Sequence, residues 1–237
     1  MAKPAFVSLT FDDGLRCQFE RAVPILDRCT LAATFFLIAN KSPWHERPDW
    51  RKIEWNADDI QSLRGMAQRG HEIGSHSVNH KDPDPQSPNF DPSFDAKFEA
   101  EESKRLIESW MGAKIQSFCY PFCKNPEPLK NAVRCAKYEQ ARAGATGLSY
   151  YSPQESIDFL SVDCRQITAN ENVSEWIRPD CWHILMIHGI GGPQDGWCPI
   201  QEDQFDTQMK DLAMRRDSGD VEVVTFKDGA ERLQQSK

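Results

Sequence analysis

Residues 6–15 read FVSLTFDDGL and join a strand-like run to a pair of acids. The run 6–11 is short, apolar, β-branched and aromatic, which predicts a buried strand. Two adjacent carboxylates, Asp12 and Asp13, stand where that strand ends, and Gly14 follows them. Because Asp and Gly are common in turns, the triplet taken alone is best explained as a turn. The surrounding sequence decides whether the two acids also have a chemical role.

Strand-like and helix-like segments alternate along the whole chain. Strands are predicted at 5–11, 31–39, 71–76, 115–120, 139–145, 159–163, 183–188 and 221–226. Helices are predicted at 18–29, 57–69, 94–111, 127–137, 171–178, 201–216 and 227–235. The length of 237 residues suits one large core, so we expect a single α/β domain over 1–237. A barrel of parallel strands is the favoured closed form.

Composition narrows the class of partner and compartment. With 28 Lys and Arg against 36 Asp and Glu, the formal net charge is −8, which argues against nucleic acid or an anionic membrane as the main partner. No apolar run is long enough to span a bilayer, and the opening MAKPAF leaves no room for a signal peptide. We therefore expect a cytoplasmic protein whose eight cysteines are reduced thiols, although an even count also allows disulfides.

Polar side chains follow many of the predicted strands at their carboxyl ends, where ligands bind in barrels and open α/β sheets. These residues are Asp12 and Asp13 after the first strand, His76 and His80 after the third, the stretch YPFCK (120–124) after the fourth, Asp163 after the sixth and His188 after the seventh. So many polar residues at one edge of the sheet predict that the functional site lies there.

The spacing of His76 and His80 indicates a metal site. Two imidazoles four residues apart can reach one ion, although such a pair alone is more often a turn cap and a solvated side chain. A carboxylate from another strand would complete a catalytic ligand set with open positions for water. One aspartate of the pair after the first strand could then bind the ion while its neighbour takes a proton from water. His188, followed by GIGG, is a candidate acid for the leaving group, or else a structural histidine at a strand end.

These motifs resemble those of the polysaccharide deacetylases, carbohydrate esterase family 4, which share the NodB homology domain. TFDDG (10–14) and HSVNH (76–80) match the first two family motifs almost letter for letter. ATFFLIAN (33–40), GHEIGSHS (70–77) and LMIHGIGG (185–192) are similar to the stretches that connect and follow them. The resemblance runs in order over roughly 5–230. It implies a distorted parallel (β/α) barrel of seven to eight strands, similar to a TIM barrel.

The resemblance also implies residue roles. It makes Asp12 the general base and Asp13, His76 and His80 the ligands of one divalent ion, with zinc first and cobalt or nickel as alternatives. His188 becomes the general acid.

Two departures from the family pattern concern the third and fourth motifs. In FCYPFCK (118–124), Cys119 stands where many members have an arginine that orients the base, and Cys123 stands at a glycine position. The fourth motif reads Asp163-Cys164-Arg165, and the resemblance implies that Asp163 orients His188. Our hypothesis is that Arg165 supplies the guanidinium missing at position 119; the alternative is that Arg165 is a surface residue.

The substrate side of the site is less defined by sequence. The resemblance implies an oxyanion-binding backbone N–H near Pro121 and Phe122. Trp197, after the glycines, is the first candidate for stacking on a sugar, ahead of Trp44, Trp50 and Trp55, although most tryptophans are partly buried core residues.

The leading functional interpretation is a hydrolase that removes acetyl groups, N-acetyl first and O-acetyl second, from a carbohydrate or oligosaccharide. One rival is a metal-dependent relative that hydrolyses a small non-sugar amide. A second rival is a carbohydrate-binding relative without activity, which we would expect to lack the base, a ligand or the acid. None of those is missing here.

Overall fold

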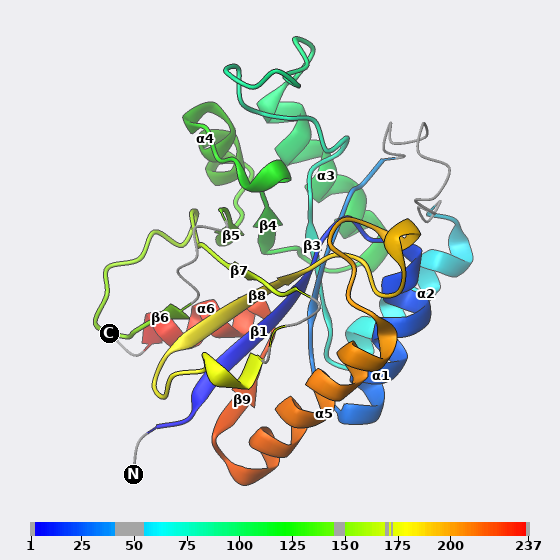
Figure 1. Ribbon diagram of the computed structural model, residues 1–237. Helices are drawn as coiled ribbons and strands as arrows, with labels where there is room; N and C mark the ends of the chain where they lie inside the picture. Colours follow the sequence, from blue (N-terminus) through cyan, green and yellow to red (C-terminus); the bar gives the residue numbers. More distant parts are fainter. Residues whose placement is uncertain (1–2, 41–54, 145–149, 169–170, 172, 236–237) are drawn as a thin grey trace.

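The computed structural model describes residues 3–40, 55–144, 150–168, 171 and 173–235 (Figure 1). Its strands are β1 Ala5–Phe11, β2 Thr34–Leu37, β3 Glu72–Ser75, β4 Ser117–Cys119, β5 Gln140–Arg142, β6 Tyr150–Tyr151, β7 Arg165–Gln166, β8 Trp182–Ile187 and β9 Val221–Val223. Its α-helices are α1 Val23–Cys29, α2 Ala57–Gln68, α3 Ala96–Met111, α4 Glu127–Cys135, α5 Glu202–Ser218 and α6 Phe226–Gln235. A π-helical turn, η1 Gln18–Ala22, precedes α1, and the 3₁₀ turns are η3 Pro121–Cys123, η4 Val173–Glu175 and η5 Pro193–Asp195.

The strands form one curled sheet in the order β5-β4-β3-β2-β1-β8-β6, with β7 beside β8 and β9 beside β1. All pairs are parallel except β6 with β8. Beyond β5 the sheet closes only through a narrow contact. There Val162, which precedes β7, forms a single parallel bridge with Arg142 of β5. The predicted distorted parallel barrel is confirmed, although the described residues form nine strands, because the two-residue strands β6 and β7 add to the longer ones. The predicted strand at 159–163 is not a regular strand: it forms this bridge, and its Phe159 carbonyl accepts from the Ala141 N–H at 2.7 Å.

Alternation along β1 gives the sheet two different faces. Val7, Leu9 and Phe11 belong to the core between the sheet and its outer helices. A second core lines the inner face of the curl, with Trp182, Ile184 and Met186 of β8 among its members. Asp12 follows β1 directly, so it lies at the rim of this curled sheet rather than in either apolar core.

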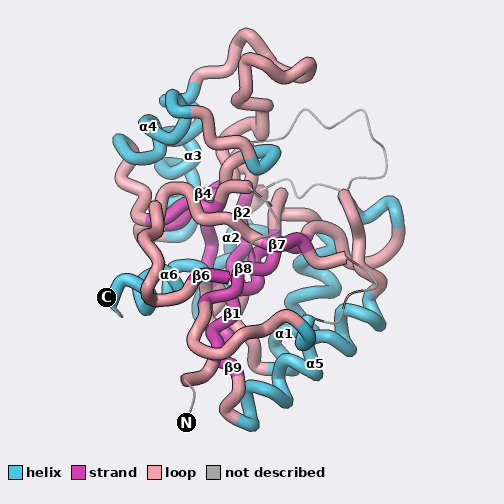
Figure 2. The backbone as a smooth tube through the Cα atoms, turned by 60° about the vertical axis from the view of Figure 1, so that its left-hand side comes forward, coloured by secondary structure: helices cyan, strands magenta, loops and turns pink. Residues whose placement is uncertain are grey.

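Helix α6 closes the amino-terminal end of the inner core, because Phe226, Ala230 and Leu233 pack there with Trp182. Close packing is visible at Gly229, where an added Cβ would lie 2.3 Å from the Trp182 ring nitrogen. Figure 2 shows the remaining helices around the strands, with α1 and α5 together on one side. One end of the curled sheet is therefore filled, and the end formed by the carboxyl ends of the strands is left for the site.

Local sequence signals explain the clearest helix boundaries. Asn56 caps α2 by accepting from the N–H groups of Asp58 and Asp59, and Asp59 accepts in return from the Asn56 N–H. Gly112 ends α3 in the left-handed region at φ 64°. The predicted helix at 171–178 is wrong in its extent, since the described residues there form only the turn η4. In the part of the chain that the structure describes, no helix has the length and apolarity to cross a membrane.

Candidate active site

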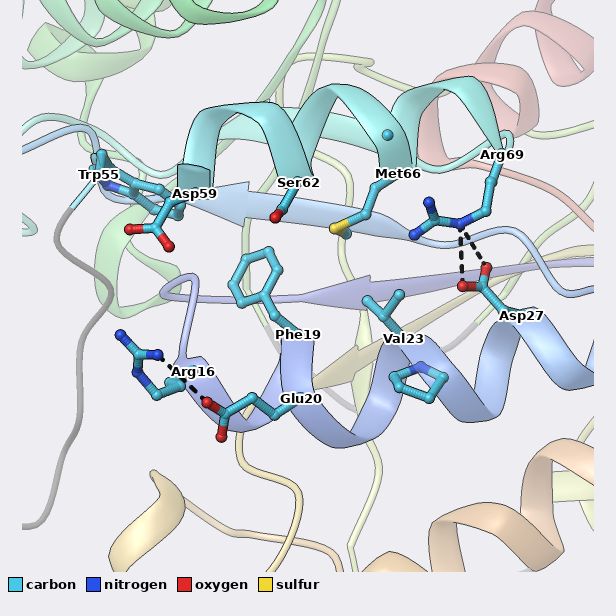
Figure 3. A pocket seen from close by; sticks show the side chains of 12 residues that line it. Arg16, Phe19, Glu20, Val23, Asp27, Trp55, Asp59, Ser62, Met66 and Arg69 are labelled. Carbon is cyan, nitrogen blue, oxygen red and sulfur yellow. Dashed lines mark hydrogen bonds and ion pairs between the residues drawn. The ribbon is translucent and has the colours of Figure 1, made fainter. Parts of the chain in front are cut away.

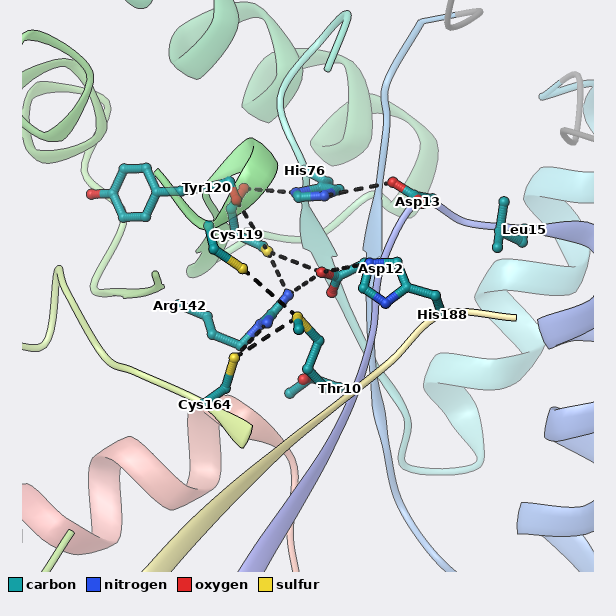
Figure 4. A network of polar contacts seen from close by, with 12 residues as sticks. Thr10, Asp12, Asp13, Leu15, His76, Cys119, Tyr120, Arg142, Cys164 and His188 are labelled. Atoms are coloured by element: carbon teal, nitrogen blue, oxygen red, sulfur yellow. Dashed lines mark hydrogen bonds and ion pairs between the residues drawn. The ribbon is translucent and has the colours of Figure 1, made fainter. Parts of the chain in front are cut away.

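The carboxyl ends of β1, β3 and β8 bring the predicted residues together. Phe11 pairs with Ile187 in the parallel register, and the Asp12 N–H donates to the Ile187 carbonyl at 3.0 Å. Asp12 and His188 are therefore neighbours at the ends of adjacent strands. His76 directly follows β3, two strands along the sheet on the other side of β1. Figure 4 shows these side chains converging at the ends of the strands.

Asp13, His76 and His80 form a group that fits one divalent ion. Asp13 Oδ1 lies 3.7 Å from His76 Nε2 and 3.5 Å from His80 Nε2, and all three ligand atoms lie within 4.8 Å of one another. Two ligands about 2.1 Å from a tetrahedral ion lie about 3.4 Å apart, so the observed separations match a shared ion. Two nitrogens and one carboxylate oxygen, with further positions open, constitute a catalytic type of divalent metal site.

The backbone that presents these ligands is strained and braced. Asp13 has φ 75° and His80 has φ 53°, in the left-handed region that non-glycine residues rarely adopt. Glu99 of α3, 1% exposed, accepts from the N–H groups of Val78 and Asn79 at 2.8 Å each. Its other oxygen accepts from the Asn79 side chain at 2.8 Å. This buried carboxylate holds the loop in the conformation that aims His80 at Asp13.

The tautomer of His76 is fixed from behind. Its Nδ1 lies 2.8 Å from the Cys119 carbonyl oxygen, which can only accept, so Nδ1 carries the proton and Nε2 presents its lone pair toward Asp13. Burial lowers the pKa of His76 to about 4, with a further contribution from His80. His76 is therefore the neutral imidazole that a metal ligand must be.

Asp12 has the environment of a poised base. It is 2% exposed; its Oδ2 contacts the Arg142 guanidinium, whereas Oδ1 is buried and has no hydrogen-bond partner among the described residues. Burial alone would raise the pKa of Asp12, but Arg142, His76 and His188 outweigh it and hold the pKa below its usual value. The result is an ionised carboxylate with one braced oxygen and one oxygen left to accept a proton.

The guanidinium beside Asp12 comes from β5, not from the predicted position. Cys119 and Arg142 are register partners in the parallel pair β4–β5, so their side chains point to the same face and the longer one reaches past the thiol to Asp12. Arg142 also donates to the sulfurs of Cys119 and Cys164 at 2.8 Å each. Figure 4 shows the guanidinium lying between these groups.

The hypothesis that Arg165 replaces the missing arginine is therefore wrong. Arg165 pairs with Glu171 at 3.0 Å and stacks on Trp176, with its guanidinium carbon 3.7 Å from the ring centre. It lies in β7, whose next pairing partner is β8, and its partners belong to the following loop rather than to the base. Position 119 holds a buried neutral thiol, since burial raises the pKa of Cys119. All eight cysteines are free thiols.

His188 faces Asp12, and the described residues do not show the hydrogen bond to its Nδ1 by which Asp163 would orient it. His188 Nε2 lies 3.7 Å from Asp12 Oδ2, and its Nδ1 has no hydrogen-bond partner in the described part of the chain. Asp163 instead receives support at its own backbone, where its N–H donates to the Tyr151 hydroxyl at 2.7 Å. The physical reason is the narrow contact beyond β5: Asp163 lies between the Val162 bridge and β7, before the chain joins β8.

Two exposed aromatic rings flank the site. Phe122, 39% exposed, lies with its ring centre 4.6 Å from that of His80, and Trp197, 51% exposed, stands edge-on to His188 at 5.0 Å. Pro121 is buried and has no N–H, while the N–H groups of Cys123 and Lys124 donate inside the turn η3. The turn η3, near which the oxyanion donor was predicted, therefore lies beside His80.

Of the other tryptophans named as sugar-binding candidates, the structure describes only Trp55. Trp55 donates to the Ile38 carbonyl and lines a pocket of about 470 Å³ between α1 and α2 (Figure 3). The described lining of that pocket includes Phe19 and Met66 but neither Asp12 nor the metal group. Trp44 and Trp50 lie outside the described residues.

Arg142 and Glu99 are the site residues that motif reasoning missed. Arg142 had a signal, because a charged residue between Ala141 and Ala143 in a predicted core strand must find a buried partner. Glu99 had none, since an acid in the first turn of a helix is ordinary.

Comparison with known proteins places this geometry in a family. The family model described as polysaccharide deacetylase matches residues 2–141. A chitin deacetylase of Colletotrichum lindemuthianum is 32% identical over 80 residues, which cover 34% of this chain and 29% of that protein. The chain spans less than half of the length of the curated relatives that it matches.

Solved structures share the fold. The cobalt-bound family 4 acetyl xylan esterase of Clostridium thermocellum is 21% identical with a TM-score of 0.60, over 94% of this chain and 89% of that one. The Xyl-CE4 domain of a xylanase from the hindgut metagenome of Trinervitermes trinervoides is 18% identical with a TM-score of 0.60, over 97% and 91% of the two chains. With the family model matching more than half of its residues, the chain belongs to the polysaccharide deacetylase family of hydrolases.

Proposed function

We propose that this protein is a zinc-dependent deacetylase that hydrolyses N-acetyl groups of a carbohydrate or oligosaccharide. The observation that carries the proposal is the juxtaposition of the Asp13, His76 and His80 group with the buried Oδ1 of Asp12, which has no hydrogen-bond partner in the described part of the chain. Family membership and the relative named a chitin deacetylase support a sugar N-acetyl group as the first choice. Zinc suits a set of two imidazoles and one carboxylate.

The protein's own residues supply the rest of the chemistry. Asp13, His76 and His80 would hold the ion, which when bound makes water more acidic and polarises the acetyl carbonyl. Asp12 accepts a proton at Oδ1, because Arg142 occupies Oδ2 and keeps the carboxylate ionised.

The opposite wall of the site handles the leaving group. His188, whose Nε2 lies 3.7 Å from Asp12 Oδ2, donates a proton to the departing amine or alkoxide. A backbone N–H near Pro121 and Phe122 serves as the oxyanion donor. The exposed faces of Phe122 and Trp197 offer apolar surfaces on which a sugar ring can stack.

The test is acetate release from a panel of N-acetylated oligosaccharides, O-acetylated xylan fragments and small non-sugar amides, with metal removed and restored. We expect release from the N-acetylated sugars that falls on chelation and returns with Zn²⁺. The matched variant Asp12→Asn keeps the shape of the base but removes its proton acceptor, and we expect it to lose roughly 100-fold or more in kcat. Release only from non-sugar amides, or from none of the panel, would overturn the proposal.

A further inference from the structure

Gln18 joins the ends of the two strands that carry the base and the acid. It is fully buried and begins the π-helical turn η1. Its side-chain amide Nε2 donates to the Asp12 carbonyl at 2.6 Å and to the His188 carbonyl at 2.9 Å. The β1–β8 backbone ladder reaches its last bond at Asp12, so this amide extends the connection one step beyond it.

The other hydrogen bonds of Gln18 fix the turn that follows Asp12. Its Oε1 accepts from the Leu15 N–H at 3.2 Å, and its own N–H donates to the Leu15 carbonyl at 3.0 Å. The buried side-chain amide of Gln18 thus makes three hydrogen bonds: two through its NH₂ group and one through its oxygen. The segment from Asp12 to Leu15, which includes the strained Asp13, is held at both of its ends.

The same helical turn also grips the loop that follows His188. Arg21 donates to the Ile190 carbonyl and to Asp195 Oδ2 at 2.7 Å each, and the Ile190 N–H approaches Cys17 Sγ at 3.4 Å. Gly191, at φ 129°, accommodates this approach, since an added Cβ would lie 1.9 Å from Arg21 Nη1. Gly191 therefore leaves room for the Arg21 guanidinium.

We propose that Gln18 is a positioning residue that sets the distance between the general base Asp12 and the general acid His188. It acts on both backbones at once, through the carbonyl groups of Asp12 and His188. The facing atoms Asp12 Oδ2 and His188 Nε2 are 3.7 Å apart, and without the shared amide nothing described joins the two strand ends beyond the Asp12 N–H bond to the Ile187 carbonyl. The expected change in kcat rests on the proposed function, whereas the expected change in the Asp12–His188 distance does not.

The test compares two substitutions at position 18 with a matched control. Gln18→Met keeps the length of the side chain without its donors, and Gln18→Glu keeps its shape but turns an acceptor toward two carbonyl oxygens. The control is Gln208→Met on α5, which removes an amide that donates to the Glu171 carbonyl at 2.8 Å. The substrate is whichever acetylated compound the unmodified protein hydrolyses, and rates are expressed per bound Zn²⁺.

For Gln18→Met we expect kcat to fall roughly 10- to 100-fold with KM within twofold, since small displacements of catalytic groups cost rates of this order. Gln18→Glu should lose more, and the pH–rate profile of both should change shape, whereas Gln208→Met should match the unmodified protein. Unchanged kcat and pH profile in soluble Gln18→Met or Gln18→Glu would overturn the proposal.

A crystal structure of either Gln18 variant separates this inference from the proposed function. We expect the Asp12–His188 separation to exceed the 3.7 Å of the unmodified protein. An unchanged separation would refute the positioning role. If the unmodified protein hydrolyses nothing in the panel, the proposed function fails while the structural comparison still decides the role of Gln18.

Discussion

The Arg142 guanidinium contacts the Asp12 carboxylate from a strand that is not adjacent to β1, reaching past its own register partner Cys119. The pair is almost completely buried, with side-chain exposures of 0% and 3%. Removing one partner from a buried ion pair leaves the other charge without compensation, which is far more costly than losing a surface pair.

Replacing Arg142 by Met should therefore change both stability and pH dependence. We expect the free energy of unfolding to fall by about 3–5 kcal/mol, measured by urea denaturation. Burial then dominates at Asp12 and raises its pKa, so the acidic limb of the pH profile of kcat/KM should move to higher pH. Arg142→Lys, which keeps the charge, should shift that limb less.

Arg165 offers the control for that experiment. Arg165→Met breaks the half-buried pair with Glu171 and should cost no more than about 1 kcal/mol. Its pH profile should match that of the unmodified protein. An acidic limb that moves with Arg165 rather than with Arg142 would contradict the assignment of the base's partner.

Glu99→Gln should weaken metal binding without touching a ligand. The amide NH₂ would meet the donors of Val78 or Asn79, so the loop that holds His80 at positive φ loses part of its brace. Loss of such support typically costs about 10- to 100-fold in metal affinity. A chelator-competition titration with Zn²⁺ measures it, and Glu101→Gln, on the exposed face of the same helix, should retain full affinity. Equal affinities for the two variants would refute the bracing role.

Acid should destabilise the metal-free protein through His183, which is fully buried. Burial lowers the pKa of His183 to about 4, whereas an unfolded histidine titrates near 6.5. Between those values the unfolded state binds the extra proton, so stability is complete above about pH 6.5 and is lost as the pH falls toward 4. At pH 5 this loss amounts to about 2 kcal/mol. His183→Gln should show that much less decline between pH 7.5 and pH 5, and a decline equal to that of the unmodified protein would contradict the prediction.

The position of the ion can be checked by anomalous diffraction at the zinc edge. A single peak should lie about 2.0–2.2 Å from Asp13 Oδ1, His76 Nε2 and His80 Nε2. Asp12, His76 and Cys119 also offer ligand atoms within 4.8 Å of one another. We expect that second group to stay empty, because the Arg142 guanidinium lies against Asp12 and the Cys119 sulfur and repels a cation. A peak there instead would contradict the assigned roles of Asp12 and Asp13.

The predictable parts of this structure are those with a local sequence signal. The ends of β1, β3 and β8 could be placed from short apolar runs followed by Asp12, His76 and His188, because parallel strands present their carboxyl ends at one edge. The source of the guanidinium beside Asp12 could not be predicted, because the register that sets Arg142 beside Cys119 is a long-range property of the sheet. The same limit applies at 159–166, where one bridge and a two-residue strand replace a regular strand.

On the proposed function, a metal ion held by Asp13, His76 and His80 is needed for deacetylation. The most direct test of this requirement is acetate release from an N-acetylated oligosaccharide by metal-stripped protein during titration with Zn²⁺. We expect negligible release without metal and a linear rise that ends at one Zn²⁺ per chain. Release at the full rate from protein shown to be free of metal would contradict the requirement.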